Sequence, residues 1–567
     1  MKFFGSLLAD ETLGGEHAAL RVQVQKWRGL RHVCRLDRLA VALLLVGAGF
    51  RVGQYAIGAA LWHDELALAR NIVEKPIREL LTAPLDYTQV APPGFLLIEK
   101  AAIIILGNNE YALRLFPLLC ALASLPLFTY IARRTLLPGA ALLAVALFSL
   151  SPTLVGFGSQ VKQYGLDVAA AVLMVALTLW WERRGKDRAV PETVLLGAVG
   201  FVAVWFSHTT VLVLAGLGVA LLLEASCRRE RILLWELLPI AILWGAGALA
   251  VIAYGLQTMS PSTYNYMGAY WSERFMPLPT RSIDDALWLW RAFRGLFQDQ
   301  LRYPLPEVGV LLMLLGAVTL ARRGHWPAGV LLAPLGVSLV ASAARQYPFG
   351  DRVSLFLLPL ILLLLVEGVD RVRRAIADRW GRVDAIVLAL ATVAPVYALY
   401  ASYPLYPEQR MPEVLAYIQA NRQPQDSVYV YHGAWHAVGY YGPRYGLSLY
   451  AVVRGSCGDP RRLLGDLDQF RGRAHLWVIL SHVVGPFRER EAILGYLDTI
   501  GERRDSIVTF DRARKPSSSA YLYDLSDPAR LRSSSASTYR LPPQRQGREY
   551  PCVAVYKAPH RQAHAGS

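Results

Sequence analysis

Apolar runs long enough to cross a membrane recur along the first two thirds of the chain. A helix needs about 20 apolar residues to span the hydrocarbon core of a bilayer. Eleven such runs lie near residues 37–58, 112–132, 138–157, 164–182, 190–207, 209–226, 232–256, 305–321, 327–344, 353–369 and 384–402. Because helices satisfy their own backbone hydrogen bonds in lipid, these runs predict a mainly α fold, a polytopic transmembrane helical bundle.

Basic loops follow the even-numbered runs and predict the orientation. The positive-inside rule places such loops in the cytoplasm. We therefore predict a multi-pass protein of the cell inner (cytoplasmic) membrane, with its N-terminus cytoplasmic and its C-terminal region extracytoplasmic, in the periplasm if the host is Gram-negative. The net charge of +16 follows from these loops, so no nucleic-acid partner is expected. The loops are Arg133–Arg134, 183–188, 228–231, Arg322–Arg323 and 371–382.

The chain changes character after residue 403, and this change predicts its domains. Helix-like segments such as MPEVLAYIQANR there alternate with β-branched and aromatic runs such as DSVYVYH and HLWVILSH. This alternation predicts a small extracytoplasmic α/β domain. The predicted parts are a cytoplasmic arm over 1–36, a transmembrane domain over 37–403 with an outer loop at 59–111, the α/β domain over 404–525, and a largely disordered tail over 526–567.

Two features of the outer regions carry narrower expectations. The apolar segment FLLIEKAAIIILG in the outer loop is shorter than a span and carries two charges, which favours a helix lying on the membrane surface. Cys457 and Cys552 are the two cysteines after residue 403, and an oxidising compartment would allow them to pair. The alternative is two unpaired thiols.

Ionisable residues gather at the outward ends of the predicted spans, where they are costly and mark function. A bundle would let them share one cavity. Arginine and lysine would hold a phosphate group there, and a carboxylate would accept a proton from an incoming hydroxyl or amine. This inventory favours transfer of a group from a lipid phosphate. The residues are Asp64 and Glu65, the segment SQVKQYGLD at 159–167, His208, and RQYPFGDR at 345–352.

Each of these residues also has a structural interpretation. Asp64 and Glu65 could cap a helix, because acids favour helix N-termini. Lys162 could reach to the membrane surface along its aliphatic stem. His208 could be a packed core residue, and Arg352 could pair with the neighbouring Asp351.

Five short motifs, taken in order, resemble the integral-membrane GT-C glycosyltransferases. They resemble in particular the family-39 group, which includes protein O-mannosyltransferases and the lipid A aminoarabinose transferase. The resemblance covers about residues 35–370, and it rests on the order and spacing of the motifs rather than on any one of them. The motifs are W-x-DE at 62–65, PPGF at 92–95, ALR at 112–114, KQY-x-x-D at 162–167 and YPFGDR at 347–352.

The resemblance implies an activity, its partners and the roles of residues. A sugar would pass, with inversion, from a polyprenyl-phosphate donor to an unknown glycan, lipid or protein acceptor on the outer face of the cytoplasmic membrane. Asp64 would be the general base and Glu65 an acceptor or metal contact, or the reverse. No cofactor is certain, and a divalent metal stays open. The donor or phosphate residues would be Lys162, Tyr164, Arg345 and Arg352, with His63, His208 and Asp167 as further candidates.

Two other classes of protein remain open at this point. A transporter or lipid flippase would also carry many spans and buried charges, although such proteins often show internal repeats and midplane sites. No repeated half is visible, and the charges lie at one face. A non-catalytic membrane scaffold would not need acids, lysine and arginines in the membrane part.

Overall fold

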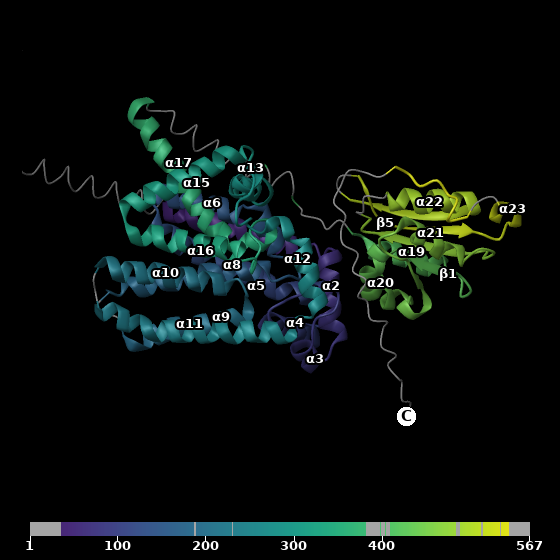
Figure 1. The fold of residues 1–567 in the computed structure, drawn as a ribbon, viewed down its shortest axis with the longest axis horizontal. Helices are drawn as coiled ribbons and strands as arrows, with labels where there is room; N and C mark the ends of the chain where they lie inside the picture. Colours follow the sequence, from purple (N-terminus) through teal and green to yellow (C-terminus); the bar gives the residue numbers. More distant parts are fainter. Residues whose placement is uncertain are drawn as a thin grey trace, which may run out of the picture.

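The computed structural model describes residues 36–185, 189–228, 231–380, 397, 403, 409–483, 488–511, 514–532 and 535–543. Figure 1 shows a bundle of long helices and, beside one end of it, an α/β domain. The predicted fold class is confirmed in this form, a helical membrane bundle followed by an α/β domain.

Seven helices in the described ranges are long and apolar enough to cross a membrane. The short apolar helices α6 (Pro138–Ser149) and α9 (Val190–Phe206) and the charged-ended helix α15 (Pro306–Arg323) fall on three more predicted spans. The seven are Leu36–Ala56, α5 (Glu110–Thr135), α8 (Tyr164–Arg183), α10 (Thr210–Arg228), Trp235–Thr258 of α11 (Arg231–Thr258), α16 (His325–Ala343) and Asp351–Ile376, formed by η4 (Asp351–Leu357) and α17 (Leu358–Trp380).

Two predicted spans need comment. The run at 138–157 is two helices, because Ser151 caps a new helix, α7 (Pro152–Phe157), and the proline ring of Pro152 does not fit a continuing α6. The eleventh run, at 384–402, lies outside the described residues apart from Tyr397.

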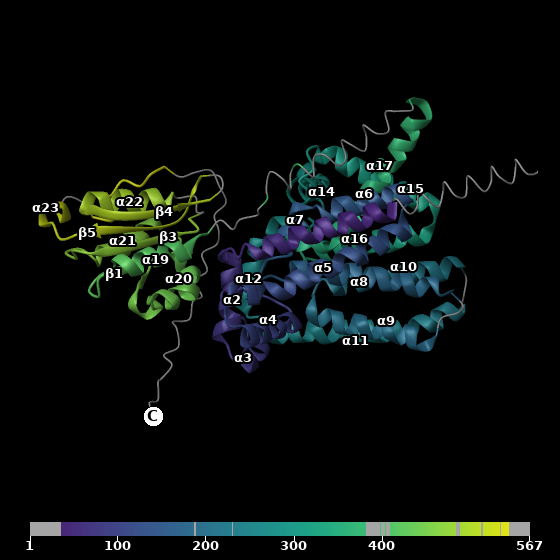
Figure 2. The same ribbon diagram turned by 180° about the vertical axis from the view of Figure 1, so that it is seen from behind.

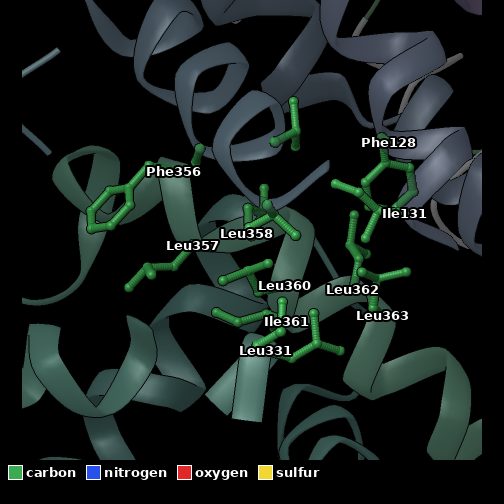
Figure 3. Packing of buried hydrophobic residues seen from close by; sticks show 14 of the residues in the cluster. Phe128, Ile131, Leu331, Phe356, Leu357, Leu358, Leu360, Ile361, Leu362 and Leu363 are labelled. Carbon is green, nitrogen blue, oxygen red and sulfur yellow. The ribbon is translucent and has the colours of Figure 1, made fainter. Parts of the chain in front are cut away.

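The first half of the leucine-rich helix α17 lies buried inside the bundle. Leu358, Leu360 and Ile361 are buried, and Figure 3 shows the neighbouring leucines packed near Phe128 and Ile131 of α5. α17 crosses α15 very closely: a Cβ atom on Gly316 would overlap the Leu364 carbonyl oxygen. Small residues allow two membrane helices to approach in this way.

Short helices cover the end of the bundle that faces the α/β domain. Figures 1 and 2 both show α2 (His63–Glu74), α3 (Ile77–Thr82), α4 (Pro93–Leu106) and α12 (Pro261–Tyr270) at this end. α4 contains most of the predicted surface segment FLLIEKAAIIILG. The remaining short elements of the bundle are η2 (Ser272–Arg274), α13 (Ile283–Ala286), α14 (Trp288–Gly295) and η3 (Leu296–Gln300).

The α/β domain contains one five-stranded sheet in the order β2-β1-β3-β5-β4. Strands β2 (Val453–Arg454), β1 (Ser427–Val430) and β3 (Leu476–Ser481) are parallel, and β5 (Pro516–Asp524) and β4 (Glu502–Phe510) extend the sheet antiparallel. The helical elements are α19 (Met411–Asn421), η6 (His432–Ala434), α20 (Trp435–Tyr441), η7 (Gly442–Tyr445), η8 (Leu449–Ala451), α21 (Pro460–Asp468), α22 (Glu489–Ile500) and α23 (Pro528–Leu531).

Part of the segment that we expected to be a disordered tail packs on this domain. Arg461 donates hydrogen bonds to the carbonyl groups of Ala536, Ser537 and Tyr539, and the Tyr539 ring lies 5.3 Å from that of Tyr496. These hydrogen bonds and this ring contact hold part of the chain beyond residue 526 on the domain. Residues 1–35 and 544–567 lie outside the described residues, as does Cys552; Cys457 is disulfide-bonded.

The α/β domain contacts the bundle through α20 and the following η7. The Leu61 N–H donates to the Tyr441 hydroxyl (2.8 Å), the Tyr440 hydroxyl donates to Asn108 (2.8 Å), and Arg444 pairs with Glu110 at 3.1 Å. Apolar side chains of α2 and α20 share one buried cluster. The segment that carries Asp64 thus lies between the two parts of the protein.

Candidate functional site

Asp64 and Arg352 form an ion pair at the end of the bundle. The Asp64 Oδ2 and Arg352 Nη2 atoms are 2.8 Å apart, with side chains 24% and 19% exposed. Asp64 lies in the first turn of α2, and Arg352 lies at the start of η4. The neighbouring Asp351 accepts a hydrogen bond from the Arg352 backbone N–H (2.7 Å). The guanidinium of Arg352 pairs with Asp64.

Aromatic rings surround the guanidinium of Arg352. The central carbon of the guanidinium lies 5.8 Å from the ring centroids of both Trp62 and Trp271. Its Nη2 atom donates a hydrogen bond to the Tyr270 hydroxyl at 3.5 Å. Rings at these distances attract a cation. The pair itself remains partly exposed to solvent.

Lys162 is the second cation of the site. It is buried, and its Nζ atom donates to the Gln89 side chain at 2.6 Å. Burial lowers the pKa of Lys162 to about 8, against the opposing effect of Asp64. A buried ammonium held by the outer loop is not a surface anchor, so the snorkelling interpretation of Lys162 is wrong.

Two neighbouring cations determine the direction in which the pKa of Asp64 is shifted. Burial by itself would raise its pKa, but the positive charges of Arg352 and Lys162 outweigh burial and hold the pKa below its ordinary value. Asp64 is therefore ionised at neutral pH. Tyr164, at the first position of α8, is buried, and it lies within electrostatic range of both Asp64 and Arg352.

Glu65 points away from Asp64 into the protein. Arg114 donates to both Glu65 oxygens, at 3.1 and 2.8 Å, and the backbone N–H groups of Val161 (2.8 Å) and Trp62 (3.1 Å) donate as well. The predicted role of acceptor or metal contact does not fit this geometry, because protein donors occupy both oxygens. No group of three or more His, Cys, Asp or Glu in the described ranges could hold a metal ion.

Three other candidates lie away from the ion pair. Arg345 is exposed, with its guanidinium 5.5 Å from the Phe275 ring. Asp167 accepts from the Ser207 hydroxyl at 2.6 Å. His208, whose pKa burial lowers to about 4, lines a hollow that is also lined by Gln89, the hydrogen-bond partner of Lys162. The structure thus joins Asp64, Lys162 and Arg352, and does not bring these three to them.

His63 faces the α/β domain instead of the bundle. Its ring stacks on that of His482, with centroids 4.1 Å apart and planes 7° apart, and meets His436 edge-on at 5.0 Å. Four further residues of this site were not predicted from the sequence, namely Gln89, Arg114, His436 and His482. Arg114 belongs to the ALR motif, which gave a signal, whereas no sequence signal links the two α/β histidines to Asp64.

Glu99 on α4 is a buried carboxyl group outside the ion-pair site. Neither of its oxygens has a hydrogen-bond partner among the described residues, and burial holds its pKa well above the ordinary 4.5. The folded protein therefore keeps a proton that the unfolded chain loses above about pH 4.5.

We expect the folded state to lose stability as the pH rises from about 4.5 toward the folded-state pKa of Glu99. The slope should approach 1.4 kcal/mol per pH unit for one proton. Melting temperatures of the protein in lipid nanodiscs between pH 5 and 9 would measure it. The variant Glu99→Gln should remove most of the slope, and an equal slope in both proteins would contradict this assignment.

The fold of this chain is similar to that of solved membrane proteins. Neither a protein-family model nor a curated protein sequence matches this chain. Two structures of ArnT from Cupriavidus metallidurans, one bound to undecaprenyl phosphate and one in the apo state, match it with a TM-score of 0.50. Sequence identity is 12% and 11%, over 86% and 87% of this chain and 97% and 98% of ArnT.

A weaker likeness is to the Archaeoglobus fulgidus oligosaccharyltransferase, in a complex with zinc and sulfate. The TM-score is 0.46 and the identity 12%, over 85% of this chain and 73% of the oligosaccharyltransferase. The likeness to ArnT confirms the predicted GT-C fold. At this identity it establishes the fold alone.

Proposed function

We propose that this protein is a membrane glycosyltransferase that moves a sugar from a polyprenyl-phosphate donor to an acceptor, with Asp64 as the general base. One observation carries the proposal: a carboxylate and two cations from three separate segments meet in a partly open site at one end of the bundle. The match to ArnT bound to undecaprenyl phosphate supports a donor of this class.

The proposed reaction has one chemical step. An acceptor hydroxyl or amine attacks the anomeric carbon of the sugar while Asp64 takes its proton. The bond between the anomeric carbon and the phosphate oxygen breaks, and the electron pair stays on the phosphate. The acceptor approaches from the side opposite the leaving group, so the configuration at the sugar carbon inverts.

Arg352 and Lys162 would hold the phosphate and stabilise the charge that develops on it. Arg grips phosphate oxygens with two hydrogen bonds, and fixed cations stabilise a leaving phosphate. Arg352 pairs with Asp64 in this structure. A bound phosphate would share Arg352, weaken that pairing and make Asp64 more basic as the donor arrives.

Glu65 and Arg114 take a positioning role in this proposal. Their buried pair ties the first turn of α2 to α5, and Glu65 also binds the backbone of Val161, next to Lys162. The pair therefore fixes the relative positions of the base and a cation. The site lies at the end of the bundle that carries the α/β domain, and the basic loops favour the outer face of the membrane for this end.

Release of a labelled sugar from a panel of polyprenyl-phosphate sugars would test the function. We expect one donor to be turned over by the protein in nanodiscs, with the free polyprenyl phosphate as the second product. Lys162→Met should raise the KM for that donor by about tenfold or more, because it removes the buried positive charge that would bind the donor phosphate.

Arg345→Met is the matched control, because Arg345 lies outside the ion-pair site, and its KM should stay near the wild-type value. Equal KM values for Lys162→Met and the wild type would remove Lys162 from the donor site. Binding of a donor without turnover, in the presence of a broad acceptor mixture, would favour a flippase instead.

A further inference from the structure

The parallel strands of the α/β domain end at the segment that carries Asp64. β1 lies between β2 and β3, so the chain leaves β1 first toward one side of the sheet and later continues on the other side. In open α/β sheets, ligands bind at such a switch point, outside the carboxyl ends of the strands. His432 follows the end of β1 by two residues, and His482 follows β3 directly.

The side chain that lies at this switch point is that of His63, from α2 of the bundle. The His63 ring stacks on the His482 ring and meets His436 edge-on, and it is hydrogen-bonded to the backbone of Gly433. A Cβ atom on Gly433 would lie 2.7 Å from the carbonyl oxygens of Ser481 and His482. Glycine therefore lets the segments after β1 and β3 come together around the His63 ring.

The backbone of His482 supports a specific role for this ring. The φ angle of His482 is +52°, in the left-handed region that residues other than glycine rarely adopt. Such conformations persist where the surroundings fix them, and they concentrate at functional sites. The conformation directs the residue after β3 toward α2, where its ring meets His63.

We propose that the α/β domain positions Asp64 by seating His63 at its switch point, with His482 as the positioning residue. The inference rests on the proposed function of Asp64. His63 is the first residue of α2, and Asp64 is the second. The Glu65–Arg114 pair holds the same turn from the bundle side, so this turn is fixed between two bodies and Asp64 stays aligned with Arg352.

Burial of the two rings makes the contact sensitive to acid. Burial lowers the pKa of His63, and it lowers the pKa of His482 to about 3, so both rings are neutral at pH 7. The free energy that these neutral rings contribute to folding is fully present above the ordinary histidine pKa of about 6.5, and it is lost as the pH falls toward the folded-state pKa values. Other groups facing the rings are Asp64 and Lys162 from the bundle side, His432 and His436 from the α/β domain, and Arg70 and Arg454 near His436.

The variant His482→Asn tests the proposal, because asparagine tolerates a left-handed backbone and the variant removes only the ring. We expect kcat for sugar transfer to fall about tenfold with little change in donor KM. Hydrogen exchange across residues 61–75, measured by mass spectrometry on the whole protein in nanodiscs, should rise. Exchange in β1 and β3 should stay as in the wild type, which shows that the domain is folded.

Two comparisons sharpen the test. His475→Asn is the matched control: His475 is in the same domain, bound to Asp426 at 2.9 Å, and should change neither kcat nor exchange. His63→Asn should act like His482→Asn, and the double variant should be no worse than either single one, because the rings act as a pair. Additive losses would overturn the pairing.

The outcomes separate this proposal from the proposed function. Unchanged exchange over 61–75 in His482→Asn would overturn the positioning role, whatever the activity. If no donor is turned over by the wild type, the glycosyltransferase function fails. Raised exchange in the variant would then still show that the α/β domain holds the start of α2.

Discussion

Asp64→Asn is expected to reduce sugar transfer at least about a hundredfold while donor binding is kept or improved. A general base contributes about 10²–10⁴ to the rate, and an amide of the same shape cannot take the proton. The variant also removes the negative charge that Arg352 pairs with at 2.8 Å. Arg352 is then free to bind the donor phosphate, so we expect kcat to fall and the donor KM to stay the same or decrease. Steady-state release of labelled sugar in nanodiscs measures both constants.

Glu79→Gln gives the matched control for this prediction. Glu79 belongs to the same outer loop, but its side chain is 50% exposed and pairs with Lys75 at 2.8 Å, away from the ion-pair site. This variant should keep wild-type constants. If Asp64→Asn also kept them, with normal insertion and melting temperature, Asp64 would have no part in the chemistry. If the donor KM rose strongly while kcat stayed near the wild-type value, Asp64 would belong to the donor site and not to proton transfer.

Periodicity and length made most of the fold predictable from the sequence. Apolar runs of about 20 residues have few alternatives to membrane helices. The alternation of helix-like and strand-like segments after residue 403 predicted the helices and strands of the α/β domain. Short elements were missed, because α20 with 7 residues and β2 with 2 residues give no periodic pattern. The break between α6 and α7 was also missed, although Ser151 and Pro152 mark it.

The candidate site was predictable in composition but not in direction. Asp64, Lys162 and Arg352 all follow or precede apolar runs at one predicted face, so a bundle had to bring them to one end. Asp64 and Glu65 are neighbours in sequence, yet successive side chains on a helix point about 100° apart. One therefore faces Arg352 and the other faces Arg114, and adjacency alone did not show which acid would face the open site.

Contacts between the two parts of the protein had no sequence signal. His63 and His482 are separated by more than four hundred positions, and their stacking depends on how the α/β domain sits on α2. Arg345 shows the opposite case: its charge and its place in the YPFGDR region suggested a phosphate contact, but it is exposed beside Phe275. A charged residue near a site in sequence can turn to solvent when the local backbone directs it there.

Arg114→Met is expected to destabilise the protein by about 3–5 kcal/mol, because it leaves a buried carboxylate without its cation. The Glu65 side chain is 1% exposed, and two of its four donors come from Arg114. The start of α2 should loosen, so sugar transfer should fall as well. Thermal unfolding in nanodiscs would measure the stability, and limited proteolysis of the outer loop would report the local effect.

A second variant and a control on the same helix separate the buried charge from simple loss of an arginine. Glu65→Gln combined with Arg114→Met removes the orphaned charge and keeps an acceptor oxygen for one of the two backbone N–H groups, so it should recover more than half of the lost stability. Arg133→Met removes an arginine of α5 that pairs with Asp37 at 2.8 Å with both side chains about half exposed. Exposed pairs contribute about 0–1 kcal/mol, so this variant should melt near the wild type. Equal melting of Arg114→Met and Arg133→Met would mean that the buried pair does not hold α2 in place, and Asp64 would then depend on the α/β domain alone for its position.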